Sequence, residues 1–451
     1  MDNIGQNSNL RAFSFLPFFN VEVSLVGVSP EPEVSLTSKN GLDNLRFYAK
    51  ALMIHWKAQQ QPRRKSTYTN GPAPKPMLTA DRKVEQLLYA FSLLISRTRS
   101  NHNRKKHKSA GGEIAACALR EQPLASKNAG ARSYVLFAAK NHGFSQEDRD
   151  YLESIVDWVN SPTADEREIY ALVMDHLPQR IQSYRDGILK KENVIRPSPL
   201  EPNQEAMLER LINLHNELAE RRDSEDLHTT LKQVAFFVAQ NRELARSIGL
   251  CRSEEFKDVD KIWDEVERLS RVGMAVKMVK TFRHEVIRTD STFSIYPVTT
   301  SKRERFHDGV TFDNAIQEIK TYVDKTSAAE KNASSLNRDF SRRLRDSRKF
   351  SHFLGDIHCE VQLLEHFLVK DRDGLTNVYD YIACSKEPCW LCDFAVRAAT
   401  RFRMSESHGG VYWDWPLPKS LINNNAKFRK AVERIDKKML GIIRDASVAL
   451  Q

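Results

Sequence analysis

The stretch that decides the fold reads H-C-E at residues 358–360 and, after 27 further residues, P-C-W-L-C at residues 388–392. A histidine nitrogen and two cysteine sulfurs are ligands that zinc prefers, and three protein ligands leave the fourth position of a tetrahedral ion open to water. The pattern therefore predicts a zinc site with Glu360 as the group that carries protons to and from that water. The three predicted zinc ligands are His358, Cys389 and Cys392.

The spacing within each half of the pattern indicates how the side chains reach one ion. Pro388 stands where a helix tolerates proline best, at its very start. Two cysteines at C-x-x-C spacing can reach one ion from the first turn of that helix, where backbone N–H groups stabilise thiolates. His358 and Glu360 are two residues apart, roughly 200° around a helix. The spacing therefore predicts that these two act together only where the end of their helix faces the metal.

The residues around this pattern resemble the cytidine-deaminase-like superfamily. The resemblance rests on I-A-C-S-K-E-P-C-W-L-C at 382–392 and on S-H-G-G-V-Y-W-D-W-P at 407–416, and covers about residues 352–418. The run is similar to nucleic-acid or nucleotide deaminase domains of fungal proteins, which are related to bacterial toxin deaminases. The resemblance implies a hydrolase with a Zn²⁺ cofactor, in which zinc-bound hydroxide attacks an amino-bearing nucleobase carbon and Glu360 shuttles the protons. It also suggests His408 as a residue of the substrate pocket, with a turn residue as the alternative.

Two other kinds of metal site would use the same cysteines and are alternatives to a catalytic zinc. A structural zinc site would take Cys359 or Cys384 as its fourth ligand and would leave Glu360 without a role. The spacing C-x4-C-x2-C from Cys384 to Cys392 is also that of plant-type iron–sulfur proteins, but a fourth cysteine is expected downstream and none follows Cys392. Cys359 stands where the deaminase resemblance has a small residue, often alanine, and is a further candidate ligand. A non-catalytic scaffold with a structural zinc is the alternative function.

Composition limits the classes of protein that the chain fits. Its 451 residues are long enough for two or three domains, and no run reaches the ~20 apolar residues that a membrane-spanning helix needs. The N-terminus has no basic start before an apolar core, so we expect no signal peptide and an intracellular protein, cytoplasmic or nuclear. Six cysteines in a chain of this length do not indicate a disulfide scaffold.

The positive charge of the chain is concentrated in one segment. The net charge is +10, and residues 61–108 hold 12 Lys/Arg against 2 Asp/Glu. This segment is either a solvated linker or a contact for a polyanion. Residues 351–451 carry 14 Lys/Arg and 13 Asp/Glu, so their composition is balanced. The substrate class stays open between a nucleotide, single-stranded DNA and RNA, and no membrane partner is expected.

Apolar periodicity predicts an N-terminal all-α helical region followed by a C-terminal α/β domain, which the resemblance describes as three-layer and cytidine-deaminase-like. Helices are expected at 41–57, at 81–97, after Ser145, after Pro202, at 310–325, at 334–350 and at 426–447. An edge strand that contains Pro297 is expected at 291–299. The predicted parts are an N-terminal segment at 1–58, a basic linker with one helix at 59–112, a helical domain at 113–289 and a zinc domain at 290–451.

Overall fold

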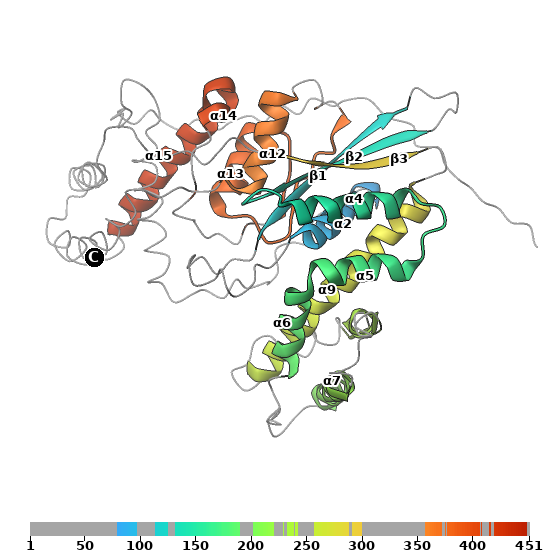
Figure 1. Ribbon diagram of the computed structural model, residues 1–451. Coiled ribbons are helices and arrows are strands. Elements are labelled where there is room, and N and C mark those ends of the chain that lie inside the picture. The colour runs from blue at the N-terminus through green and yellow to red at the C-terminus, as the bar shows by residue number, and fades with distance from the viewer. Residues whose placement is uncertain are drawn as a thin grey trace, which may run out of the picture. The chain divides into compact units, whose positions relative to one another are not determined.

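The computed structural model describes only part of the chain, all of it within one compact unit, Leu42–Gln451 (Figure 1). Among the described residues, no helix is both long and apolar enough to cross a bilayer. His408 and most of the basic segment 61–108 lie outside the described part, as do helices predicted at 41–57, 310–325 and 334–350. The described residues are 79–96, 113–124, 131–189, 202–220, 229, 232–238, 240–241, 257–287, 291–299, 357–371, 375, 377–405, 407, 415 and 419–448.

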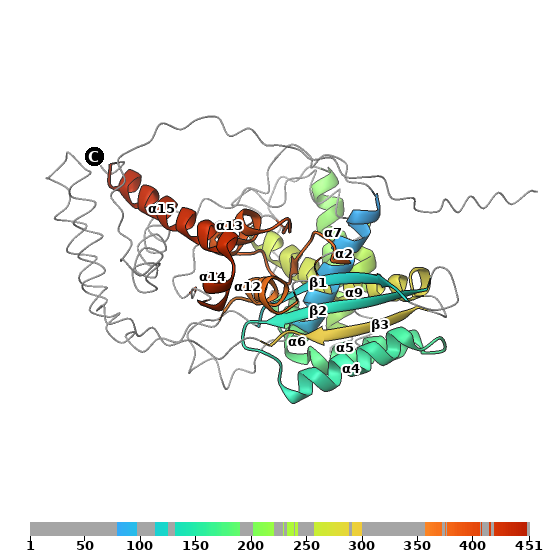
Figure 2. The ribbon, with the colours of Figure 1, turned by 90° about the horizontal axis from the view of Figure 1, so that it is seen from above.

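Within the described part of the chain, four strands form one mixed sheet in the order β3-β2-β1-β4. β1 pairs antiparallel with both β2 and β4, while β3 runs parallel to β2 at the sheet edge (Figure 2). The position of β3 at the sheet edge confirms the predicted edge strand. Its proline, Pro297, lacks the backbone N–H donor that a central strand would need. The strands are β1 (Ala115–Pro123), β2 (Arg132–Lys140), β3 (Thr292–Pro297) and β4 (Ala383–Cys384).

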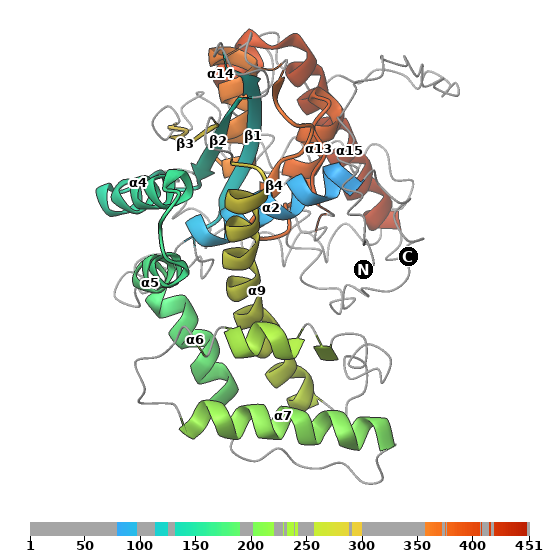
Figure 3. The same cartoon turned by 90° about the vertical axis from the view of Figure 1, so that its right-hand side faces the viewer.

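The helices cover both faces of this sheet. Successive strand residues point to opposite faces, so Cys117 and Leu136 enter one hydrophobic core while Ala116 and Phe137 enter another. The first core includes α2, α4 and α9, and α9 packs against α6 and crosses α2 near its own C-terminal end (Figure 3). The second core includes α12, α13 and α15. The helical elements are α2 (Thr79–Ile95), α4 (Gln146–Asn160), α5 (Glu166–His176), α6 (Pro178–Leu189), α7 (Pro202–Glu220), α9 (Lys257–Glu285), α12 (Cys359–Glu365), the π-helical turn η3 (His366–Lys370), α13 (Trp390–Ala399), α14 (Lys419–Asn424) and α15 (Ala426–Val448).

The prediction of an all-α region before the C-terminal domain is wrong for β1 and β2. Both strands lie within residues 113–289, and the sheet takes strands from both sides of residue 290. β1 opens with alanines, which favour helices, and β2 buries residues on both faces, so neither strand shows the polar–apolar alternation of a half-buried strand. The mixed helical and sheet composition agrees with the coarser fold class. The three-layer deaminase fold and the four-part division stay predictions.

The helices expected from periodicity are present as α2, α4, α7 and α15. α4 begins with the capping box expected at Ser145. The Ser145 Oγ accepts a hydrogen bond from the Asp148 N–H at 3.1 Å, and the Asp148 Oδ2 accepts one from the Ser145 N–H at 2.9 Å. Two backbone donors at the helix start are satisfied in this way.

A fully buried lysine stands at the end of β2. The Lys140 Nζ lies 2.5 Å from the Glu113 Oε2 and 2.8 Å from the Asp148 Oδ2, and its side chain is 0 % exposed. The Asp148 Oδ1 lies 3.7 Å from the Nε2 of His176, whose ring stacks on Tyr151 with 3.7 Å between centroids. This cluster ties the end of β2 to α4 and α5, so the chain that follows Lys140 leaves the sheet from a fixed point.

Asp148 makes the stability of the fold sensitive to acid. Burial would raise the pKa of its carboxyl group, but the hydrogen bond and charge of Lys140 and the bonds from Ser145 prevail and lower it. A group with a lowered folded pKa stabilises the protein above its unfolded pKa of about 4, and this contribution is lost as pH falls through the folded value. We expect Asp148→Asn to be less stable than the wild type at neutral pH and to lose less further stability below about pH 4. Urea unfolding between neutral and acid pH measures both effects.

The exposed Asp157 on the same helix provides the matched control. Asp157→Asn should reproduce the acid sensitivity of the wild type. An Asp148→Asn protein with the same loss of stability on acidification as the wild type would show that other groups cause it.

Candidate metal centre

Two helix N-termini meet at the candidate site. His358 is the N-cap residue of α12, with extended backbone angles, and Glu360 lies in the first turn of that helix. Cys389 is the N-cap residue of α13, and Cys392 lies in its first turn. The arrangement agrees with the expectation that the end of a helix, rather than its side, presents His358 and Glu360 to the metal.

The donor atoms are spaced as a tetrahedral ion requires. The His358 Nδ1 lies 3.7 Å from the Cys389 Sγ and 3.3 Å from the Cys392 Sγ. All three ligand atoms lie within 4.8 Å of one another. Zn–S bonds of about 2.3 Å and Zn–N bonds of about 2.0 Å at tetrahedral angles place the donors about 3.5 Å apart. The three residues are therefore close enough to hold one metal ion, and they leave its fourth position to another ligand.

The protonation of the two cysteines differs although both are buried. Burial alone would raise the pKa of the Cys389 thiol, but the hydrogen bond from Cys392 and the adjacent His358 prevail and lower it to about 6. Burial and the hydrogen bond and charge of Cys389 raise the pKa of the Cys392 thiol well above its usual value. The pair thus holds one negative charge at neutral pH, which a cation would neutralise.

Backbone and indole N–H groups support the sulfur atoms. The Cys392 N–H donates to the Cys389 Sγ at 3.4 Å, and the Nε1–H of the buried Trp415 donates to the Cys392 Sγ at 3.1 Å. The Ser407 Oγ donates to the carbonyl oxygen of Pro388 at 3.0 Å, directly before Cys389. Such contacts around a ligand fix its orientation. Ser407 and Trp415 therefore help to hold the two cysteines.

Glu360 is buried beside the candidate ligands, with 4 % of its surface exposed. Its Oε2 lies 3.8 Å from the Cys392 Sγ and accepts a hydrogen bond from the Cys359 thiol at 3.4 Å. A carboxylate at this distance from a metal ligand is close enough to exchange a proton with a small molecule in the site.

The other two nearby cysteines are not arranged as ligands. Burial, with the adjacent Glu360 charge, raises the pKa values of the Cys359 and Cys384 thiols well above the usual range. Within the described part of the chain, the compact group of donor atoms contains neither of them. The geometry therefore favours three protein ligands over the fourth-cysteine site and over the iron–sulfur spacing.

The end of β2 holds the start of α12. The Asn141 Oδ1 accepts a hydrogen bond from the Cys359 N–H at 2.9 Å. The Gln362 Nε2 donates to the carbonyl oxygens of Lys140, at 2.9 Å, and Ile357, at 2.6 Å. These bonds connect the buried lysine cluster to the helix turn that carries His358 and Glu360. Sequence reasoning missed Asn141 and Gln362, because 218 residues separate Asn141 from its partner and no local pattern marks them.

A mixed helix-and-sheet fold with a histidine and two cysteines at facing helix starts defines a protein with a candidate metal-binding site. Residues 357–419 match the sequence model of a family described as OTT_1508-like deaminase. The match confirms the predicted deaminase resemblance and shows a deaminase-like domain that contains all three candidate ligands and Glu360. No protein of curated function and no solved structure matches the chain significantly.

Proposed function

We propose that the chain is a zinc-dependent hydrolytic deaminase that acts on an amino-bearing carbon of a nucleobase, in a nucleotide or a nucleic acid. The observation that carries the proposal is the group formed by His358, Cys389 and Cys392 beside the buried Glu360. This group lies within the segment that matches the deaminase family. The donor set leaves one metal position open, which is typical of catalytic rather than structural zinc.

The residues of the site have distinct roles in the proposed reaction. Zinc held by His358, Cys389 and Cys392 would lower the pKa of a bound water to about 7 and so make it a nucleophile. Glu360 accepts a proton from the attacking water and delivers it to the ring nitrogen beside the attacked carbon. The second proton of the water passes from the hydroxyl group on the attacked carbon to the amino group, the C–N bond breaks, ammonia leaves and a carbonyl group remains.

Replacement of one candidate ligand tests whether the site holds zinc. A second cysteine outside the donor group shows whether the loss of any buried cysteine has the same effect. We expect Cys392→Ser to lose most of its zinc, because a serine hydroxyl replaces one of three protein ligands. Wild-type protein should purify with about one zinc ion per chain, and chelation should abolish deamination. Metal analysis and ammonia release from nucleosides, single-stranded DNA and RNA measure both effects.

Cys384→Ser is the matched control, since Cys384 is equally buried and near Glu360 but lies outside the donor group. It should keep its zinc. Wild-type protein that holds one tight zinc but deaminates none of the three substrate classes would favour a non-catalytic scaffold with a structural zinc.

A further inference from the structure

A row of positive charge runs along the exposed face of α15. Its five residues recur at positions i, i+3, i+7, i+10 and i+11, which places them within an arc of about 100° around the helix. All five side chains are exposed, while Phe428, Val432 and Ile435 of the opposite face are buried. We call this row the basic stripe, and it consists of Lys427, Lys430, Arg434, Lys437 and Lys438.

Much of the positive charge of residues 351–451 lies on one helix, α15, although the composition of these residues is balanced. Half of the 14 Lys/Arg of residues 351–451 lie on α15. The half-buried acidic residues Glu433 and Asp436 lie on the other flank of the helix. Among the described residues, no ion pair involves Lys427, Lys430 or Arg434. The balanced composition therefore hides a surface of one sign.

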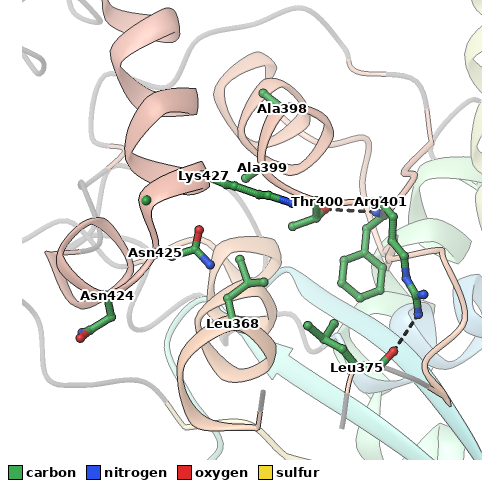
Figure 4. Close-up of a pocket in the computed structure, with 11 residues that line it drawn as sticks. Leu368, Leu375, Ala398, Ala399, Thr400, Arg401, Asn424, Asn425 and Lys427 are labelled. Atoms are coloured by element: carbon green, nitrogen blue, oxygen red, sulfur yellow. Dashed lines mark hydrogen bonds between the residues drawn. The ribbon is translucent and has the colours of Figure 1, made fainter. Parts of the chain in front are cut away.

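One end of the basic stripe borders a cavity of about 870 Å³ at the C-terminal end of α13. Figure 4 shows the Lys427 side chain extending toward Thr400 and Arg401. The Arg401 Nε pairs with Asp380 at 2.7 Å, and its guanidinium also donates to the carbonyl oxygen of Leu375 at 2.7 Å, so its position is fixed. None of the eleven lining residues is acidic, which suits a negatively charged ligand.

The other end of the basic stripe lies beside the first turn of α13. The Lys438 Nζ lies 5.6 Å from the ring centroid of Trp390 and 5.4 Å from that of Phe394. Trp390 follows Cys389 directly and precedes Cys392 by two residues. The stripe therefore runs beside α13 from its last residues to its first, where the candidate metal ligands lie.

We propose that the basic stripe binds the phosphate backbone of a single-stranded nucleic acid and leads it along α13 toward the metal centre. The choice of substrate rests on the proposed deaminase function, whereas the binding itself does not. Rows of Lys and Arg follow a phosphate backbone, and aromatic rings at the end of such a row accept stacked bases. The half-buried rings of Trp390 and Phe394 lie at that end. A deaminase also needs its target base unpaired, which a single strand provides.

The shape of this surface favours a nucleic acid over a membrane. Helices that bind bilayers insert large apolar side chains beside their basic residues. The exposed large apolar residues of the described part are Phe236, Met274 and Tyr296, none of which lies on α13 or α15. A single row of cations without exposed large apolar side chains beside it fits a flexible chain of phosphates.

The test measures binding of full-length protein to fluorescent 20-nucleotide single-stranded RNA and DNA across salt concentrations. The stripe variant combines Lys427→Gln, Lys430→Gln and Arg434→Gln. We expect the affinity of the stripe variant to be lower by roughly tenfold or more near 0.1 M salt. The slope of log K against log salt concentration should fall in magnitude by about 2, because each of the three lost phosphate contacts contributes about 0.7. The matched control combines Arg167→Gln, Arg271→Gln and Lys277→Gln, which removes the same charge from exposed positions outside both the basic stripe and residues 61–108. It should bind nearly as the wild type does.

Three results would overturn the proposal. The stripe variant could bind as tightly as the wild type, or both triple variants could weaken equally, which would assign binding to net charge or to other segments. Alternatively, the stripe variant could lose binding only to vesicles that contain phosphatidylserine, which would assign the surface to membranes. The measurement detects binding and does not depend on deamination. A wild-type protein that binds through the basic stripe but deaminates no substrate would contradict the proposed reaction, while the proposal for the basic stripe would still hold.

Discussion

Glu360→Gln is expected to abolish deamination while the protein keeps its metal. The amide replaces the carboxylate with nearly the same shape but cannot accept a proton from the attacking water. Positioned acid–base groups contribute about 10²- to 10⁴-fold to rate, so kcat should fall by that range. The three candidate metal ligands remain, and Glu360 lies 3.8 Å from one of them without belonging to the donor group. Metal analysis and steady-state kinetics on the same preparations measure both properties.

Glu365 on the same helix provides the control for this substitution. It is equally buried, and its Oε1 accepts a hydrogen bond from the Ser420 hydroxyl, away from the candidate ligands. Glu365→Gln keeps an acceptor for that bond and should retain most of the activity. A Glu360→Gln enzyme with near wild-type kcat would remove Glu360 from the proton transfer and leave the metal site without its proposed chemistry.

The candidate site could be predicted from sequence because its chemistry is local. His358 and Glu360 lie in one helix turn, and Cys389 and Cys392 in another, so fixed spacing carries the information. The supports of the site could not be predicted in this way. The contact between Asn141 and the Cys359 N–H exists only because β2 ends beside α12 in the folded chain.

The helices of the fold were more predictable from sequence than the strands β1 and β2. Amphipathic helices such as α4 and α15 show their period in the sequence, because one face is buried and the other is exposed. β1 and β2 enter a hydrophobic core on each face, and this removes the alternation by which a strand is found. The charge count of residues 351–451 also hid the basic stripe, since acidic residues elsewhere in that region offset the excess of Lys and Arg on α15.

Lys140→Met is expected to lower the free energy of unfolding by about 3–5 kcal/mol. Removal of one partner from a buried ion pair leaves an uncompensated charge, and this cost exceeds the net value of the pair. The lysine is 0 % exposed, and its loss would leave the carboxylates of Glu113 and Asp148 without their cation. Urea unfolding followed by tryptophan fluorescence measures the change. Because Gln362 bonds to the Lys140 backbone, we also expect weaker binding of Co²⁺ at the candidate metal site.

A triple variant distinguishes uncompensated charge from lost packing. Lys140→Met with Glu113→Gln and Asp148→Asn removes all three charges while it keeps similar volumes. Replacement of a buried ion pair by neutral groups is often close to neutral for stability, so the triple variant should recover more than half of the loss and also regain Co²⁺ affinity. If Lys140→Met alone costs less than about 1 kcal/mol, the magnitude expected of an exposed ion pair, water reaches the cluster. In that case the end of β2 does not depend on Lys140 to hold the turn that carries His358 and Glu360.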